Sequence, residues 1–260
     1  MEYLISSRRA RPGDDPIFAL NAEAKARAAK GEDIVNATIG ALLDDDGKLA
    51  VMPSVVEALG RIEPRVTAAY APIPGRPDFR EAVRKDLLDE FGLTDIAANV
   101  ATPGGSGALR MAIDDFLDHG QTVLTSSYFW SPYRTLADEA GRTLTTFNMF
   151  GADGRLDVAA LDAAVTKVMA DQGRALLFLN TPCHNPTCFS MDAAEWAATV
   201  ELLRKHAKTG PVVVLVDVAY SYYAEEGLSV AVEALKPALD ELLVLFAWSA
   251  SKSFAQYGLR

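Results

Sequence analysis

The sequence is poor in the residues that build disulfide-rich and metal-binding proteins. It has two cysteines, Cys183 and Cys188, and three histidines among 260 residues. Two cysteines are too few for a disulfide framework, and no second cysteine pair lies nearby to complete a zinc site. We therefore expect two reduced thiols, no bound metal and a cytoplasmic protein.

Positive charge is also scarce. Lysine and arginine number 25, against 35 aspartate and glutamate residues, which gives a formal net charge of -10. Binding to nucleic acid, or to an anionic membrane surface, requires clustered basic side chains that contact phosphate groups. The composition argues against both partners. It does not exclude a small anionic substrate, because a site can be locally basic on an acidic protein.

Long apolar runs are missing as well. A membrane-spanning helix needs about 18 apolar residues, and the longest runs here, around 211–220 and 242–250, are shorter than that. The first residues, 1–11, lack the apolar core of a signal peptide and predict a short solvated arm. The sequence therefore indicates no membrane partner.

The composition that is present, half apolar and 23% charged, is typical of a globular protein with a sizeable core. From position 104 onward, short apolar segments alternate with longer amphipathic ones. Continuous Val/Leu runs such as 212–216 are typical of strands that are buried on both faces. The alternation predicts an α/β fold: a three-layer α/β/α large domain with a mostly parallel sheet at 51–260. Residues 1–50 are expected to form an arm and part of a small domain.

The expected elements begin and end at proline, glycine and charged residues. Helices are expected at Pro16–Gly31, Pro53–Ile62, Asp78–Phe91, Ala108–Leu117, Tyr133–Ala140, Leu156–Ala170, Asp192–Lys208 and Val230–Leu239. Strands are expected at Asp33–Gly40, Gln121–Thr125, Thr143–Phe147, Ala175–Asn180, Val212–Val218 and Leu242–Trp248. The glycine-rich segment Gly104–Gly107 is expected to be a loop before its helix.

Polar residues gather directly after these strands, where ligands bind in open α/β sheets. Lys252 follows the last strand, and a poorly solvated lysine there becomes an amine nucleophile, although a lone lysine after a strand is more often a solvated loop residue. Asp217 ends another strand and can pair with a cationic ring nitrogen; the alternatives are a helix cap or a metal ligand. The segment 102–109, TPGGSGAL, opens a helix and can bind phosphate through backbone N–H groups, or form an ordinary turn.

Taken in order, these segments resemble the motifs of fold-type I (class I/II) aminotransferases that depend on pyridoxal 5'-phosphate (PLP), in the aspartate and aromatic amino-acid branch. The matching segments are 104–110 (GGSGALR), 184–187 (HNPT), 217–220 (DVAY) and 249–252 (SASK), with Arg260 after them and Tyr70 before them. The resemblance covers nearly the whole chain. It implies a transaminase that transfers an amino group between an L-amino acid, of aspartate or aromatic type, and a 2-oxo acid through a Schiff base on Lys252.

The resemblance also implies a role for each matched residue. Lys252 would hold the cofactor and move the substrate proton, while Asp217 would pair with the ring nitrogen. Asn185 and Tyr220 would hydrogen-bond the 3' oxygen of the ring. Trp130 would stack on the ring, its alternative being a plain core aromatic. The phosphate would lie against Gly105, Ser106, Ser249 and Arg260.

A substrate site shared between two subunits is implied in the same way. Tyr70 would reach the phosphate bound in the neighbouring subunit, which implies a homodimer. Ile39 and Gly40 match the family's substrate-contact loop, and they would contact the substrate together with Trp130 and Asn185.

The sequence departs from the family pattern at two points. Cys188 stands where the motif usually has glycine, so a positive φ there would strain the side chain by ~1 kcal/mol or more. Family members also continue well past the lysine motif, whereas this sequence ends at Arg260. The resemblance thus implies an incomplete small domain, and no arginine here matches the one that binds the substrate α-carboxylate.

Two alternatives to a transaminase stay open. Another fold-type I PLP enzyme, such as a β-lyase or a decarboxylase, would share Lys252, Asp217 and Asn185. A non-catalytic PLP-binding fragment is the second alternative, because the expected carboxyl-terminal part of the small domain is missing.

Overall fold

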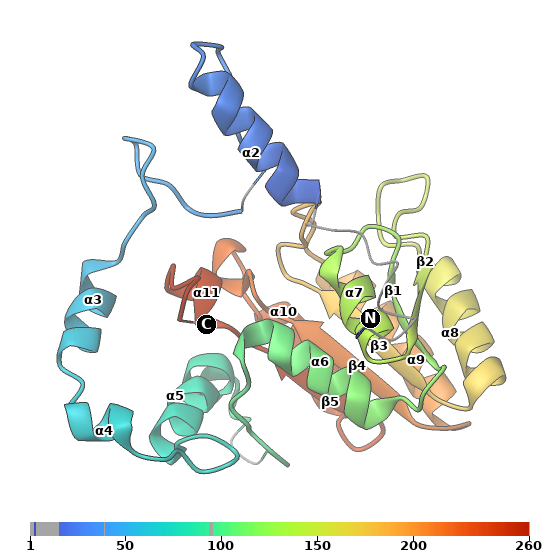
Figure 1. Ribbon diagram of the computed structural model, residues 1–260. Helices are drawn as coiled ribbons and strands as arrows, with labels where there is room; N and C mark the ends of the chain where they lie inside the picture. The colour runs from blue at the N-terminus through green and yellow to red at the C-terminus, as the bar shows by residue number, and fades with distance from the viewer. Residues whose placement is uncertain (1–2, 4–15, 39, 94–95, 260) are drawn as a thin grey trace. The chain divides into compact units, whose positions relative to one another are not determined.

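A computed structural model describes residue 3 and residues 16–38, 40–93 and 96–259. The chain divides into two compact units, Met1–Val51 and Met52–Arg260, each with its own local structure. Figure 1 labels the helices and strands. Within these described ranges, no helix is long and apolar enough to cross a membrane.

The N-terminal unit contains the helix α2 (Pro16–Ala28) and a tight turn. The turn is closed by an antiparallel bridge between Leu43 and Leu49. The expected strand at 33–40 is wrong for the residues described there, which are neither helix nor strand. The expectation of a strand rested on apolar residues such as Val35. Its side chain is 94% exposed and is therefore not buried against a sheet or a core.

The larger unit is built on a sheet of five parallel strands in the order β2-β1-β3-β4-β5. Its strands are β1 (Thr122–Ser126), β2 (Thr143–Phe147), β3 (Ala175–Asn180), β4 (Val212–Asp217) and β5 (Leu243–Ala247). From β1 the chain moves outward to β2, and then returns to β3 and proceeds the other way. The strand order therefore reverses between β1 and β3, and ligands bind at such a point in open α/β sheets.

Helices cover both faces of this sheet and give the unit three layers (Figure 1). Both faces need this cover, because successive apolar side chains along a strand point to opposite faces. Leu176 and Phe178 of β3 pack on one side with α6 (Gly104–Phe116) and α7 (Pro132–Glu139). Leu177 and Leu179 pack on the other side. That second core includes α8 (Val158–Gln172), α9 (Ala193–Ala207) and α10 (Ser229–Leu235). Because successive strand side chains point to opposite faces, one buried strand supplies both cores.

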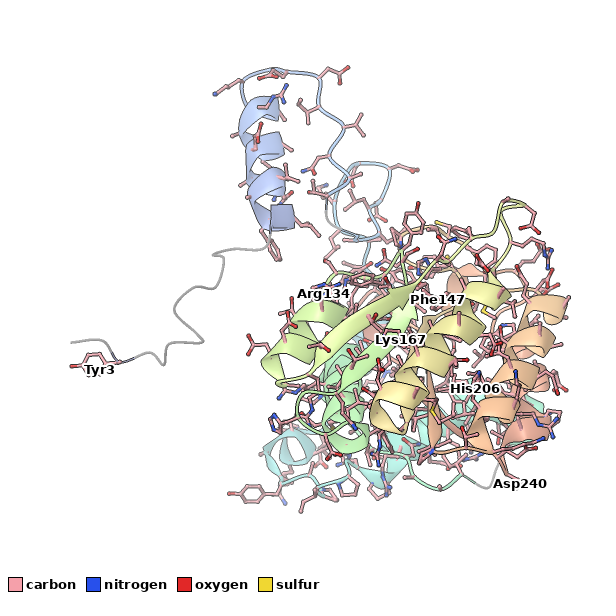
Figure 2. All side chains as sticks on the ribbon, turned by 90° about the vertical axis from the view of Figure 1, so that its right-hand side faces the viewer. Tyr3, Arg134, Phe147, Lys167, His206 and Asp240 are labelled. Carbon is pink, nitrogen blue, oxygen red and sulfur yellow. The ribbon has the colours of Figure 1, made fainter. Side chains whose placement is uncertain are left out.

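The helical layer formed by α8, α9 and α10 carries polar contacts between its helices. In Figure 2, Lys167 of α8 and His206 of α9 lie on this layer, and the His206 ring is 2.6 Å from Asp162 Oδ1 of α8. Helix α9 begins with a capping box, in which Asp192 and Glu195 each accept a hydrogen bond from the other's backbone N–H. The other elements of this unit are α3 (Pro53–Gly60), α4 (Pro64–Ala68), α5 (Pro77–Leu88), η1 (Asp89–Phe91), η2 (Ser221–Tyr223), η3 (Lys236–Ala238) and α11 (Ala250–Ser253).

The glycine-rich segment differs from the sequence-based expectation. Gly104–Gly107 is not a loop before the helix but the first turn of α6. Gly104 has a φ of +66°, which glycine adopts without steric cost. A Cβ at Gly107 would lie 2.7 Å from Cδ of Pro103, so only glycine allows the chain to turn this tightly into the helix. Helix α4 was also not expected from the sequence.

Candidate functional site

The carboxyl ends of three neighbouring strands are aligned by the register of the sheet. Asn180 of β3 pairs with Asp217 of β4, and Asp217 pairs with Ala247 of β5. Because Ser249 and Lys252 follow Ala247 directly, the expected lysine and the expected carboxylate emerge at the same edge. The sequence places these residues after strands, and the register now brings the strand ends together.

Asp217 is a buried carboxylate with neutral donors around it. The hydroxyl of Tyr133 donates to Oδ2 at 2.6 Å, and the N–H of Ala219 donates to Oδ1 at 3.2 Å. Burial raises the pKa of the Asp217 carboxyl above its ordinary value, although these two hydrogen bonds act in the opposite direction. A cationic partner at this carboxylate would relieve the cost of burying its charge.

Tyr133 is a site residue that the sequence reasoning did not assign. It is fully buried on α7, and its ring makes edge-on contacts with Trp130 at 5.8 Å and with Phe178 at 5.3 Å. Its distance of one helical turn from Trp130 could have suggested that both side chains point toward the same place. The contact with Asp217 links Trp130, after β1, to the end of β4.

Lys252 lies in α11, a short helix immediately after β5, and not in a loop. Its Nζ is 5.4 Å from the ring centre of Tyr220 and 4.8 Å from that of Tyr257. Burial lowers the pKa of the Lys252 amine, which favours the neutral, nucleophilic form. The hydroxyl of Tyr223 donates to the Lys252 carbonyl at 3.3 Å. Tyr223 and Tyr257 were also missed, because single tyrosines carry no motif signal.

The segment that carries Asn185 is held against the strand ends by Asn180. The Asn180 Oδ1 accepts from the N–H of Asn185 at 2.6 Å, and its Nδ2 donates to the carbonyl of Asp217 at 3.0 Å. The His184 ring lies 2.8 Å from the hydroxyl of Thr187 and 3.1 Å from the carbonyl of Tyr128. Asn185 is thus placed between the ends of β1 and β4.

The backbone at Cys188 has a φ of +59°, so the side chain does occupy the left-handed region that motivated the strain argument. Cys183, at the start of the same segment, has a φ of +56°. Both thiols are free.

The expected phosphate-binding turn lies beside the segment that contains the lysine. A Cβ built at Gly105 would be 3.5 Å from the Cβ of Ser249. The Ser249 hydroxyl accepts from the N–H of Ser251 at 3.1 Å and donates to its hydroxyl at 3.0 Å. Ser106 is in the first turn of α6, where the N–H groups of Gly104 and Gly107 donate to the carbonyls of Thr102 and Pro103, and the N–H groups of Gly105 and Ser106 come before any carbonyl of an earlier helical turn. The geometry offers an anion site formed by the start of α6 and Ser249.

The structure does not place four of the expected residues in this cluster. The Tyr70 side chain is fully exposed, and Gly40 belongs to the N-terminal unit. Ile39 and Arg260 lie outside the described residues. Among the residues that are described, no group of three or more His, Cys, Asp or Glu side chains could hold a metal ion.

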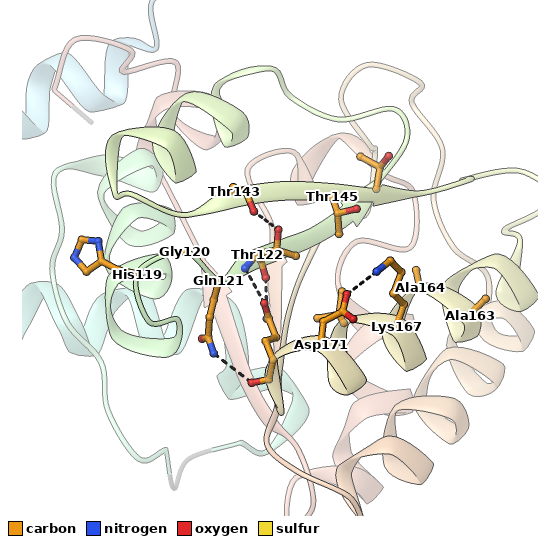
Figure 3. A pocket seen from close by; sticks show the side chains of 13 residues that line it. His119, Gly120, Gln121, Thr122, Thr143, Thr145, Ala163, Ala164, Lys167 and Asp171 are labelled. Atoms are coloured by element: carbon orange, nitrogen blue, oxygen red, sulfur yellow. Dashed lines mark hydrogen bonds and ion pairs between the residues drawn. The ribbon is translucent and has the colours of Figure 1, made fainter. Parts of the chain in front are cut away.

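A hollow of about 790 Å³ lies elsewhere on the larger unit, beside the amino-terminal ends of β1 and β2 and against α8 (Figure 3). Its polar groups bind one another: Gln172 accepts from the N–H of Thr122 at 2.8 Å, and Lys167 pairs with Asp171 at 2.6 Å. None of the expected site residues lines it. Lys252, Asp217 and Asn185 therefore lie away from this hollow, at the carboxyl-terminal edge of the sheet.

Comparison with known proteins finds aminotransferases. An aromatic-amino-acid aminotransferase of Pseudomonas aeruginosa is 31% identical over 256 residues, which are 95% of this chain and 61% of the relative. An aspartate aminotransferase of Escherichia coli is 30% identical over 256 residues, which are 95% of this chain and 62% of the relative. The chain thus spans less than two thirds of the length of these curated relatives.

Solved structures agree. An aminotransferase from Anaerococcus prevotii matches with a TM-score of 0.92 and 34% identity, over 100% of this chain and 65% of the other. The fold is shared by the aromatic-amino-acid aminotransferase of Burkholderia pseudomallei covalently bound to pyridoxal phosphate, with a TM-score of 0.73 and 24% identity over 98% of this chain and 64% of the other. The family model for aminotransferase class I and II matches residues 32–260. The chain belongs to the aminotransferase class I and II family.

Proposed function

We propose that this protein is a PLP-dependent aminotransferase, with Lys252 as the residue that holds the cofactor. The observation that carries the proposal is the arrangement at one edge of the sheet: a desolvated amine at Lys252, a buried carboxylate at Asp217 and a glycine turn beside Ser249. These three features suit the aldehyde, the ring nitrogen and the phosphate of PLP.

The chemistry of the residues fits that group. Within the described part of the chain, buried Asp217 accepts hydrogen bonds from a phenol and an amide, which are both neutral, and a protonated ring nitrogen would supply a cation. The start of α6, at Gly105 and Ser106, offers backbone N–H groups to a phosphate, with the Ser249 hydroxyl beside them. When bound, PLP supplies an aldehyde that takes up the amino group and a ring that accepts electrons.

The residues of this chain then have separate tasks. The neutral amine of Lys252 would accept the proton from the substrate Cα and release it again on the cofactor side. Asp217 would hold the proton on the ring nitrogen, and Tyr133 holds Asp217 in place through the hydrogen bond at 2.6 Å. Asn185 and Tyr220 would donate hydrogen bonds to the 3' oxygen of the ring, and Trp130 would cover one ring face.

The proposed substrates are an L-amino acid of aspartate or aromatic type and a 2-oxo acid, as the names of the relatives suggest for those proteins. Ile39 and Gly40, together with Trp130 and Asn185, are proposed to contact them. The two free thiols support a cytoplasmic location. Recovery of the protein from a periplasmic or membrane fraction of its cell would contradict that location.

A homodimer is also part of the proposal. The segment that follows Val51 exposes many apolar side chains, and neither α3 nor α4 has a buried residue. Exposed apolar patches of this kind mark protein interfaces. The exposed side chains are Met52, Val56, Leu59, Ile62, Tyr70, Ile73 and Phe79. A second copy would cover them and place Tyr70 at the neighbouring phosphate; a protein that sediments as a monomer at all concentrations would contradict this.

The test is the absorption spectrum of the purified protein with PLP, for the wild type, Lys252→Ala and Lys167→Ala. Lys167 is a matched control because its side chain is 75% exposed on α8. In the wild type and the control we expect an absorption band near the edge of the visible range. Borohydride should fix the cofactor covalently, and peptide mapping should locate the adduct at Lys252. Neither result is expected for Lys252→Ala. An adduct pattern unchanged by Lys252→Ala would refute the assignment.

The same sample separates the alternatives. Aspartate, tyrosine or phenylalanine alone should convert the bound cofactor to its pyridoxamine form if the protein is a transaminase. Release of ammonia or carbon dioxide without that conversion would favour a β-lyase or a decarboxylase. A Lys252 adduct that no amino acid changes would favour a non-catalytic PLP-binding fragment.

A further inference from the structure

The segment between Cys183 and Cys188 folds back on itself. The N–H of Cys188 donates to the carbonyl of His184 at 2.6 Å, and the N–H of His184 donates to the carbonyl of Phe189 at 2.8 Å. The N–H of Cys183 donates to the hydroxyl of Ser190 at 2.9 Å. These bonds bring the two ends of the segment side by side, and the Cys188 thiol lies near enough to Cys183 to contribute to the raised pKa of the Cys183 thiol.

The backbone at both cysteines is in a conformation that costs energy. Among the described residues, the non-glycine residues with a positive φ are Cys183, Cys188 and Ala255. Such residues persist only where the surrounding structure holds them, and they cluster at functional sites. Here the strain falls on both members of the thiol pair.

The two thiols differ in access. Cys188 is exposed, whereas Cys183 is partly buried. Burial raises the pKa of the Cys183 thiol, and the neighbouring Cys188 adds to that effect. An oxidant therefore meets Cys188 first, and Cys183 is the second thiol, held beside it.

We propose that Cys183 and Cys188 are a redox-active dithiol that closes to an intramolecular disulfide by exchange with a low-molecular-weight disulfide such as glutathione disulfide. The Cys188 thiolate attacks one sulfur of glutathione disulfide, which forms a mixed disulfide and releases one glutathione thiolate. The Cys183 thiolate then attacks the Cys188 sulfur and releases the second glutathione. Two protein thiols are oxidised, one glutathione disulfide is reduced to two thiols, and the thiol protons pass to the leaving thiolates through solvent.

The closed disulfide would act on the candidate site, a consequence that rests on the proposed function. Asn185 lies within the loop that the bond would close. Cys183 also lies near enough to Tyr220 and Tyr223 to contribute to the raised pKa of each. The disulfide would fix the loop and remove a thiol from beside these rings. Both effects would change the hydrogen bonds that Asn185 and Tyr220 are proposed to make with the cofactor.

The experiment equilibrates the wild type, Cys183→Ser and Cys188→Ser with glutathione at reducing and oxidising ratios, followed by acid quench, alkylation and intact mass. We expect the oxidised wild type to lose both free thiols, to be lighter by two hydrogens and to carry no glutathione. Cys183→Ser should retain a glutathione adduct at Cys188. Cys188→Ser should react more slowly, because its remaining thiol is partly buried.

Three results would overturn the proposal. The first is that the wild type keeps free thiols at a ratio of oxidised to reduced glutathione that glutathionylates Cys183→Ser. The others are a stable glutathione adduct on the wild type and a disulfide between two chains. None of these readouts requires PLP. PLP titration of the oxidised and reduced wild type is the second measurement, and we expect the oxidised form to bind PLP at least several-fold more weakly. If Lys252 forms no adduct, the proposed function fails while the thiol result stands; equal PLP affinity of the two forms would overturn only the coupling.

Discussion

The hydrogen bond between Tyr133 and Asp217 offers the sharpest test of the site. Tyr133→Phe removes one hydroxyl and keeps the ring, so the edge-on contacts with Trp130 and Phe178 are retained. The hydroxyl donates to a carboxylate in a fully buried environment. A hydrogen bond to a charged group contributes about 1.5–3 kcal/mol, and we expect the free energy of unfolding to fall by an amount in that range.

The effect should depend on pH with a defined sign. The folded pKa of Asp217 is raised above its ordinary value because of burial. Its contribution to stability is therefore fully present below its unfolded pKa, about 3.9, and is lost as pH rises through the folded pKa. The Tyr133 hydroxyl favours the ionised carboxylate and limits that loss. Tyr133→Phe should then resemble the wild type at low pH and fall below it once Asp217 is ionised.

The assay is urea unfolding followed by tryptophan fluorescence across pH, without PLP. Tyr128→Phe is the matched control, because the Tyr128 side chain is half exposed. A double-mutant cycle with Asp217→Asn isolates the pair, since the loss on removing the hydroxyl should shrink when the carboxylate is absent. The reasoning is refuted if Tyr133→Phe costs the same at every pH, or costs as much in the Asp217→Asn background as in the wild type.

Two further predictions concern the amine and the turn. Because burial lowers the pKa of Lys252, an amine-reactive reagent should label it in the apo protein at lower pH than it labels Lys167, as peptide mapping against pH would measure; labelling in the reverse order would contradict the desolvation argument. Gly107→Ala places a Cβ against Pro103 and should destabilise the chain by about 1–3 kcal/mol and weaken PLP binding. Ala108→Gly is its control in the same helix, and unchanged PLP affinity in Gly107→Ala would show that this turn does not hold the phosphate.

The strands β3, β4 and β5 could be predicted because each is a short, nearly continuous apolar run, whereas β1 and β2 mix apolar residues with threonine and were recognised by their place between helices. The predicted range of β3 is the observed one, and β4 ends one residue earlier than expected, at Asp217. The segment at 33–40 was wrong because β-branched residues alone do not make a strand; a neighbouring strand must pair with them. Gly104–Gly107 was wrong because helix propensity, which disfavours glycine, was outweighed by a tight turn into α6 that requires it.

The candidate site was predicted in part, and the missing part has a physical reason. Lys252, Asp217 and Asn185 stand in recognisable motifs, but their use by this chain remains a proposal. The contact between Tyr133 and Asp217 joins residues 84 apart in sequence. It depends on how α7 packs on the sheet and on the order of the strands, which a one-dimensional pattern does not contain.

The side chain of Asn180 has a consequence of its own. Its amide nitrogen donates to the Asp217 carbonyl while its oxygen accepts from the Asn185 N–H, so the two ends of one small group have opposite polarity and both are used. Aspartate would present a second acceptor to a carbonyl, and leucine would present neither donor nor acceptor. The single amide of Asn180 thus connects the loop that carries Asn185 to the main chain of β4. A displacement of the loop would therefore also shift the backbone that carries the carboxylate, and the reverse holds equally.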